Sequence, residues 1–290
     1  MSDTEYKTVK EELQGGRGLI KEIRAKYLPD TVEMSHLAQK EFESEACDFL
    51  DVDTALNKLL CDEYQIYLNK QQLVNDGFIE YADKIATSSK HPVTRNMIDR
   101  YKELSAGNDN PTLILGDITK IITALADSNR QSRVSRSGSS LMHHIAYLLG
   151  KHGFESGVHY RREFVLSGEG DGCKLDFFFP GPEEYQHDPI NCCSVACQTT
   201  SNDRFRLTFA QMPSATRNRA CTAIGCSNFG DKLGPDSLTD NKLTEAKRNN
   251  VKFVILDKAI DKRLRDSKTV MSYKDWFAEL KNLKSFWKTV

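Results

Sequence analysis

Two polar residues stand at the ends of apolar stretches that could bring them together. Asp176 lies at the head of the run DFFF, and Gln198 closes the run INCCSVACQ. A carboxylate at the head of an apolar strand needs a charged or metal partner once it is buried. In metal-dependent nucleases an acid of this kind holds Mg²⁺, and a polar residue on the next strand orients the attacking water. The same residues are also typical of an ordinary strand end, so the pair alone leaves both interpretations open.

Three predicted strands and a helix would position this pair. Residues 160–166 and 175–179 are rich in aromatic and β-branched side chains and are bounded by Gly and Pro, which indicates strands. Residues 191–196 form a short apolar run, which is typical of a strand buried on both faces. The segment that follows, around Asp203 and Arg204, is expected to begin a helix.

Downstream of this region the pattern continues to alternate between strands and helices. Residues 218–224 and 252–256 indicate strands, and residues 238–249 and 272–283 indicate helices. The order of three strands, helix, strand, helix and strand predicts an α/β (α+β) fold, in which helices flank a mixed β-sheet.

The N-terminal part is expected to be all-helical. Its clearest apolar stripe at helical spacing consists of Leu56, Leu59, Leu60, Tyr64, Tyr67 and Leu68. Such a stripe is typical of core packing, and a helical domain that closes over DNA or mediates dimerisation is the alternative. The turn cluster GNDNPT predicts a boundary, with a helical N-terminal domain over 1–110 and a second domain over 111–290.

Basic residues before a predicted helix form a candidate phosphate site. The polar segment NRQSRVSRSGSS includes Arg133 and Arg136, and Ser139 or Ser140 could cap a helix over 141–152. Arginines beside a helix N-terminus would bind a phosphate. An ordinary exposed linker has the same composition, so this alternative stays open.

Composition narrows the class of protein. The 290 residues suffice for one large or two modest domains. A net charge of -1 and a pI near 6.7 argue against a basic surface overall, although local basic patches can still bind DNA. There is no apolar run of membrane-spanning length and no signal peptide, so we expect a cytoplasmic protein without a membrane partner. No motif for a small-molecule cofactor is found.

The eight cysteines have no framework spacing, which suits a reducing compartment. Those in the second half of the chain lack paired CxxC units, so buried structural thiols are favoured over a zinc site.

Four motifs in a fixed order carry a resemblance to a known family. They are SRSGSSLMHH, LDFFFP, ACQTTSNDRFR and KLTEAKRNNVKFVIL. From Arg130 onward the chain resembles the catalytic domain of type II restriction endonucleases of the EcoRII and PspGI group. These are PD-(D/E)XK nucleases that cut double-stranded DNA at sites with a CC…GG core. The resemblance implies a restriction-endonuclease-like fold and Mg²⁺-assisted, in-line attack of water on a phosphodiester bond. Twofold-symmetric sites favour a homodimer.

The resemblance also assigns site residues, and several depart from its pattern. Asp176 keeps the usual acid and would bind the metal. Gln198 stands where the group has Lys, Gln211 where it has a Glu on the following helix, and Met142 where it has another Glu. Gln carries no charge, but its amide can position water or contact phosphate. Glu163, on the preceding strand, is the nearest replacement acid. The alternative function is a sequence-specific DNA-binding protein on the same fold, with reduced or lost cleavage.

Base recognition is expected from the segment after the third strand. Asn202, Asp203 and Arg204 fall where the resembled group carries a basic–acidic–Arg triplet. Arg reads guanine O6 and N7, and a carboxylate accepts from the cytosine N4 amine. Asp203 and Arg204 are therefore predicted to read a C·G pair, with Asn202 in place of the usual basic residue and Arg206 as a further candidate. Asp203 could also cap a helix, which is compatible with base contact.

Overall fold

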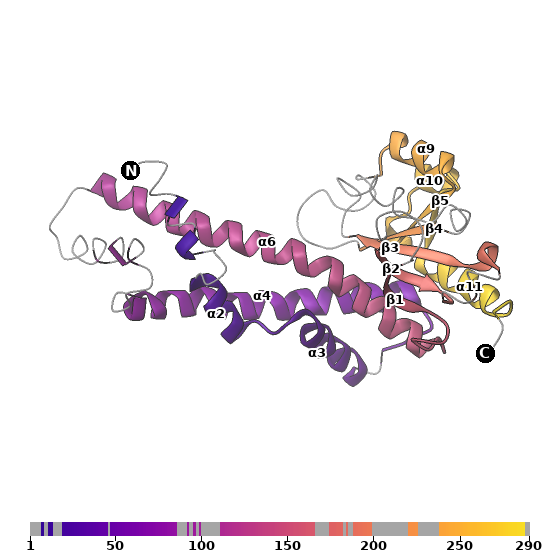
Figure 1. The fold of residues 1–290 in the computed structure, drawn as a ribbon, viewed down its shortest axis with the longest axis horizontal. Coiled ribbons are helices and arrows are strands. Elements are labelled where there is room, and N and C mark those ends of the chain that lie inside the picture. The colour runs from indigo at the N-terminus through magenta and orange to yellow at the C-terminus, as the bar shows by residue number, and fades with distance from the viewer. Residues whose placement is uncertain are drawn as a thin grey trace. The chain divides into compact units, whose positions relative to one another are not determined.

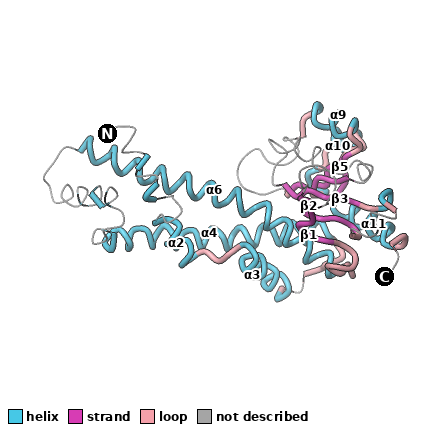
Figure 2. Tube along the Cα trace, in the orientation of Figure 1, coloured by secondary structure: helices cyan, strands magenta, loops and turns pink. Residues whose placement is uncertain are grey.

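The computed structural model describes most of the chain in seven stretches. These are residues 19–45, 47–85, 111–165, 174–181, 188–198, 220–225 and 238–287, with isolated positions at 7–8, 11–13, 92, 95–96, 99 and 184. Figures 1 and 2 show the described elements, which are a set of long helices and a β-sheet with its own flanking helices. None of the described helices is long and apolar enough to cross a membrane.

The β-sheet has six strands in the order β1-β2-β3-β4-β5-β6. The first two neighbouring pairs are antiparallel and the other three are parallel, so the sheet is mixed. The mixed sheet predicted from the sequence is therefore confirmed. Its strands are β1 (Arg161–Val165), β2 (Lys174–Phe179), β3 (Cys193–Gln198), β4 (Ala220–Ile224), β5 (Val251–Ile255) and β6 (Val270–Ser272).

Both faces of this sheet are covered, which explains why its strands are almost continuously apolar. Alternate residues of β5 show the division: Val254 belongs to the larger core, and Phe253 and Ile255 belong to a smaller one. The larger core also contains residues of α6 (Pro111–Lys151) and α11 (Tyr273–Lys284). The smaller core contains residues of α9 (Asp240–Arg248) and α10 (Lys262–Asp266).

The chain forms two compact units, each built from separate parts of the sequence. One unit comprises Met1–Met34 and Tyr64–Ser135, and the other comprises Ser35–Glu63 and Arg136–Val290. The predicted boundary near residue 110 falls outside the described residues and stays a prediction. The second unit contains the sheet, most of α3 (Thr31–Ser44) and the first turns of α4 (Val52–Ile85).

The first unit is all-helical in its described part. α2 (Leu19–Tyr27) packs Ile20 and Ile23 against apolar residues of α4 and α6. Beside this apolar cluster, Arg24 donates hydrogen bonds to Ser128 at 2.8 Å and to Asn129 at 2.6 Å. The helical N-terminal region predicted from the sequence is confirmed.

The predicted helix start near Ser139 and Ser140 is wrong. α6 is one helix of 41 residues that runs through the polar segment without a break. Asn129, the first residue of this polar segment, and Ser128 before it are buried, and both accept hydrogen bonds from Arg24. Tertiary partners have therefore overridden the local preference of these residues for turns and caps.

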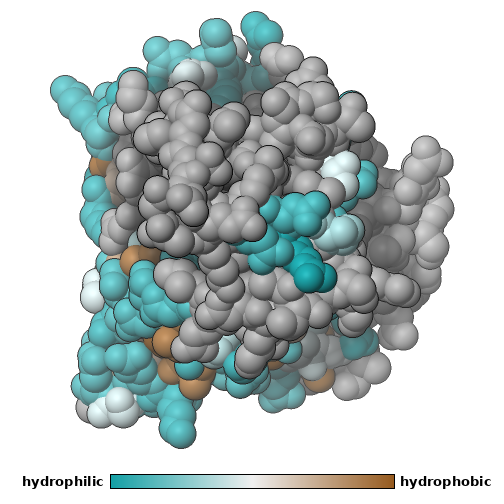
Figure 3. Space-filling view, turned by 90° about the vertical axis from the view of Figure 1, so that its left-hand side faces the viewer, coloured by the Kyte–Doolittle hydropathy of each residue, from teal (hydrophilic) through white to brown (hydrophobic). Residues whose placement is uncertain are grey.

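The coloured surface in Figure 3 is mainly hydrophilic, and hydrophobic residues form small separate areas on it. Single exposed apolar side chains are normal on a protein surface and indicate no binding site by themselves.

Candidate active site

The sheet register brings Asp176 and Gln198 to one edge and one face of the sheet. In the antiparallel pair of β2 and β3, Phe177 lies opposite Val195 and Phe178 opposite Ser194, which places Asp176 at the position opposite residue 196. Gln198 lies two residues further along β3 and therefore points to the same face. β2 begins and β3 ends at this edge. The register therefore allows the side-by-side arrangement of Asp176 and Gln198 that the sequence predicts.

A backbone hydrogen bond fixes the Asp176 carboxylate. Asp176 is half-buried, and its Oδ2 atom accepts a hydrogen bond from the backbone N–H of Cys197 at 2.7 Å. This distance is typical of a charge-assisted hydrogen bond. Burial, and then the charge of Asp176, hold the pKa of the Cys197 thiol well above its usual range. The thiol is therefore neutral near pH 7, and it is a poor nucleophile and metal ligand.

Glu163 occupies the position on β1 that faces Asp176. It lies between the paired positions Arg162↔Phe177 and Phe164↔Leu175, so the register sets it opposite Asp176. Glu163 is exposed and has a backbone φ of 49°, in the left-handed region that non-glycine residues rarely adopt. Such strain is concentrated at functional sites. The structure thus places a second acid at a position on the neighbouring strand where it could share a ligand with Asp176.

Gln198 is held in place at the end of β3. Its backbone carbonyl accepts a hydrogen bond from Gly225 N at 3.0 Å, which ties the end of β3 to the end of β4. The side chain is half-buried, and its amide oxygen is buried. An amide offers two N–H donors and one acceptor, so it can bind a phosphate oxygen or a water without carrying charge.

Helix α6 contributes no acid beside this edge in its described residues. Met142 is 8% exposed and belongs to the larger apolar core. Its neighbour His143 lies with Nδ1 2.8 Å from the Arg162 guanidinium. Burial, and then the Arg162 charge, lower the pKa of His143. The ring is therefore neutral near pH 7, and its Nδ1 accepts a hydrogen bond from Arg162.

His144 has a structural role on the same helix. It is 0% exposed, and its Nε2 lies 2.7 Å from Glu63 Oε2, an ion-pair distance, although the ring is not aligned for a hydrogen bond. Ser35 Oγ donates to the same carboxylate oxygen at 2.8 Å. The pair therefore links α3, α4 and α6 inside the second unit.

The predicted phosphate-binding residues Arg133, Arg136 and Ser139 lie within α6, each half-buried. No helix N-terminus lies next to them in the sequence, so the dipole of a helix start cannot contribute to binding there. Phosphate contact by these three side chains stays a prediction. Five other predicted site residues lie outside the described residues, so their roles stay predictions: Asn202, Asp203, Arg204, Arg206 and Gln211.

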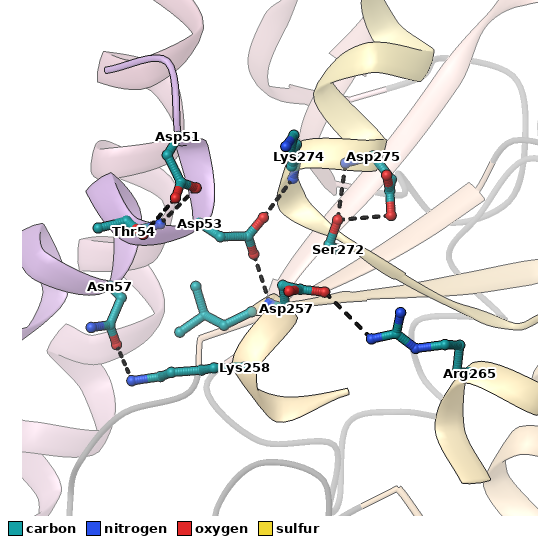
Figure 4. A pocket seen from close by; sticks show the side chains of 11 residues that line it. Asp51, Asp53, Thr54, Asn57, Asp257, Lys258, Arg265, Ser272, Lys274 and Asp275 are labelled. Atoms are coloured by element: carbon teal, nitrogen blue, oxygen red, sulfur yellow. Dashed lines mark hydrogen bonds and ion pairs between the residues drawn. The ribbon is translucent and has the colours of Figure 1, made fainter. Parts of the chain in front are cut away.

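A polar cavity of about 500 Å³ lies between the start of α4 and the ends of β5 and β6 (Figure 4). Asp53 lines it, and its carboxylate accepts hydrogen bonds from the backbone N–H groups of Asp257 and Lys274 at 2.8 Å each. Those N–H groups open η4 (Asp257–Ala259) and α11. One carboxylate therefore caps two helical segments, whose first N–H groups have no partner inside their helix. Burial is the main cause that raises the pKa of Asp53.

Other polar groups of the cavity also bind one another. Asp51 caps α4 by accepting a hydrogen bond from the backbone N–H of Thr54 at 3.3 Å, and it also accepts one from the Thr54 hydroxyl at 2.7 Å. Lys258 donates to Asn57 at 2.7 Å. Metal-ligating side chains do not gather in groups of three in the described parts of the chain. The cavity is therefore best explained as a junction that holds α4 to the sheet.

Comparison with known proteins decides the family. A family model described as "EcoRII C terminal" matches residues 100–275, which is more than half of the chain. The chain belongs to this family. A search of curated proteins gave no match.

Solved structures support the fold of an EcoRII C-terminal family member. Metal-depleted Ecl18kI in complex with uncleaved, modified DNA has 16% sequence identity, over 94% of this chain and 84% of that chain, with a TM-score of 0.67. A complex of metal-depleted Ecl18kI with uncleaved DNA has 17% sequence identity, over 100% of this chain and 87% of that chain, with a TM-score of 0.65. The complex of restriction endonuclease PspGI with substrate DNA has 15% sequence identity, over 90% of this chain and 95% of that chain, with a TM-score of 0.57. The predicted restriction-endonuclease-like fold is therefore confirmed.

One site feature of this family member was missed by sequence reasoning. Thr222 on β4 is fully buried on the sheet face of Asp176 and Gln198. The signal was weak, because a lone Thr in the apolar run ACTAI is an ordinary β-strand residue.

Proposed function

We propose that the protein is a type II restriction endonuclease, which hydrolyses phosphodiester bonds of double-stranded DNA at a specific site with a CC…GG core. The observation that carries the proposal is the placement of Asp176 and Gln198 on one face at one edge of the sheet. Membership of the EcoRII C-terminal family supports it, and solved structures with the same fold are those of Ecl18kI with DNA and of the restriction endonuclease PspGI with substrate DNA.

The acids at this edge fit a hard cation. Mg²⁺ is usually bound by one or two carboxylates, with water and substrate phosphate as its other ligands. Asp176, oriented by the Cys197 N–H, and Glu163, opposite it in the register, would supply the carboxylates. When bound, Mg²⁺ would supply charge neutralisation at the phosphate and a lowered pKa for water.

Gln198 takes the place of a cationic side chain in this proposal. Its amide contacts the scissile phosphate or orients the attacking water, and Gln211 on the following segment would assist from the position of the missing Glu. Because an amide stabilises developing negative charge less than an ammonium group, cleavage is expected to be slow for this class of enzyme.

DNA recognition is proposed for the segment after β3. Asp203 and Arg204 would read a C·G pair in the major groove, with Asn202 and Arg206 beside them. Contacts of Arg133, Arg136 and Ser139 with phosphates would set the position of the protein on the duplex. A homodimer would place two such half-sites on a twofold-symmetric sequence.

A DNA-binding protein with reduced or lost cleavage is the second candidate function. The burial of Met142 in the apolar core favours it, because that position offers no ligand for a metal or a water. Both candidates bind specific DNA, and they differ in whether the DNA is cut.

The deciding experiment is digestion of plasmid and phage DNA by the purified protein, with and without Mg²⁺. Asp176→Asn is the informative variant, because its side-chain oxygen still accepts the hydrogen bond from Cys197 while the charge is lost. Asp266→Asn, an exposed acid of α10, is the matched control.

Discrete fragments that require Mg²⁺ and disappear with Asp176→Asn but persist with Asp266→Asn would support the endonuclease. A duplex with a CC…GG core that is bound but never cut would support the second candidate. Absence of both cutting and binding would rule out both.

A further inference from the structure

A buried hydroxyl lies beside Gln198 without a partner. Thr222, in the middle of β4, is 0% exposed, and its Oγ atom has no hydrogen-bond partner in the structure described above. Its neighbours in the strand, Cys221 and Ala223, pack into the larger core on the opposite face. A buried hydroxyl without a partner is destabilising, and an isosteric Val would avoid this cost. The hydroxyl is therefore available to a polar group that comes within its reach in another state of the protein.

The sheet register places one candidate partner within reach. β3 and β4 run parallel, with Ala196 beside Thr222 and Gln198 beside Ile224. Gln198 and Thr222 are thus diagonal neighbours on one face, on strands about 4.8 Å apart, and a long side chain can reach a diagonal neighbour. The side chain at position 196 between Asp176 and Thr222 is only a methyl group. The amide oxygen of Gln198 is itself buried.

The two groups are chemically matched. A hydroxyl can donate one hydrogen bond to the Gln198 amide oxygen, and the amide N–H₂ group then points the other way. A primary amide presents either a donor or an acceptor to a phosphate, and a fixed partner is needed to select the donor. Hydrogen bonds at catalytic sites are often unformed without substrate and tighten in the complex.

We propose that Thr222 is a positioning residue: in the DNA complex its hydroxyl donates to the amide oxygen of Gln198 and so turns the amide N–H₂ toward the scissile phosphate. This inference rests on the proposed nuclease function. It also selects one of the two roles left open for Gln198, namely donation to phosphate in place of the ammonium group found in the resembled enzymes.

A double-mutant cycle tests the inference. Thr222→Val removes the hydroxyl with little change of shape, and Thr222→Ser keeps it. Each is made in the natural protein and in a Gln198→Lys background, because an ammonium group donates in every direction and needs no partner to orient it. Single-turnover cleavage of a site-bearing duplex, DNA affinity with Ca²⁺ in place of Mg²⁺, and the melting temperature are measured for every variant.

Thr222→Val is expected to slow cleavage and weaken DNA binding, the former by about tenfold, which is within the usual range of coupling between contacting residues. Its melting temperature should be unchanged or higher. Thr222→Ser should keep most of the rate. In the Gln198→Lys background, Thr222→Val should have no effect on either readout.

Equal losses in both backgrounds would overturn the inference, as would no loss in the natural protein or a serine variant as impaired as the valine variant. If the natural protein binds the duplex but does not cut it, the same cycle is judged by affinity. If it cuts and the cycle shows no coupling, the inference fails while the proposed function stands. If it neither cuts nor binds, both fail.

Discussion

Glu163 combines a strained backbone with a position that faces Asp176 across two paired strands. A left-handed conformation costs a residue with a side chain on the order of 1–2 kcal/mol, and glycine avoids that cost. A glutamate kept at such a position suggests that its carboxylate is used. At the residue scale, stability and activity should therefore respond in opposite directions.

Glu163→Gly is expected to raise the free energy of unfolding by about 1 kcal/mol, because it relieves the left-handed strain. It should also reduce Mg²⁺-dependent cleavage, because a carboxylate is lost. Glu163→Gln is the matched variant, which keeps the strain and loses the charge. Urea denaturation and cleavage rates check both effects. A glycine variant as active as the natural protein would contradict a role for this acid.

The buried pair of His144 and Glu63 gives a second test at this scale. His144→Leu puts an apolar side chain against the buried Glu63 carboxylate, which then keeps only the hydrogen bond from Ser35, and should cost about 1–3 kcal/mol. The double variant Glu63→Leu/His144→Leu should be less destabilised, because the buried carboxylate is removed together with the ring that faces it. Urea denaturation at constant pH measures the two values. A double variant that is less stable than the single one would show that the helices depend on the pair itself.

At the scale of elements, α6 stays helical through a stretch whose residues have a low preference for helix. Ser128 and Asn129 favour turns and caps, yet both lie within this helix and bind Arg24 of α2. Gly138 lies further along, and a side chain added there would meet nothing within 4 Å. Packing at Ala124 before this stretch and from Leu141 to Leu149 after it therefore outweighs the weak local preference for helix.

Two glycines in helices are predicted to respond oppositely to alanine. A Cβ atom at Gly77 would lie 2.6 Å from the Tyr27 ring, so Gly77→Ala should cost about 1–3 kcal/mol through forced repacking of α2 against α4. Gly138→Ala should stabilise α6 by about 0.5–1 kcal/mol, because alanine is the better helix former. Thermal melting of both variants checks the signs. Similar shifts in one direction would contradict the packing described for Gly77.

The raised pKa of Asp53, at the junction between α4 and the sheet, predicts that the stability of the protein depends on pH. Burial raises its pKa in the folded protein above the usual 3.8. Its contribution to stability is therefore fully present below pH 3.8 and is lost as the pH rises through the folded pKa. Asp53→Asn lacks this titration, so the advantage of the natural protein over the variant should shrink as the pH rises. Urea denaturation from pH 3 upward measures this difference, and a growing advantage would contradict it.

At the scale of the whole molecule, the sheet was predictable and its exceptions were not. The strands appeared in the sequence because apolar runs such as that of β2 are buried on both faces. β6 was missed because a strand of three residues is too short to show the alternation of apolar and polar side chains that indicates a strand. The left-handed conformation of Glu163 and the burial of the Thr222 hydroxyl could not be predicted, since each depends on strands brought together from distant parts of the chain. The continuity of α6 depended on Arg24, more than 100 residues away.

The interleaved order of the two units has a consequence for inheritance. Phe42, Leu56 and Leu59, near the start of the chain, belong to the same apolar core as Trp276 near its end. Recombination between related genes exchanges contiguous stretches, so a crossover in the long stretch between these positions would join halves of two different cores. Under the proposed function, variation in DNA specificity should therefore accumulate by point substitution more readily than by exchange of gene segments.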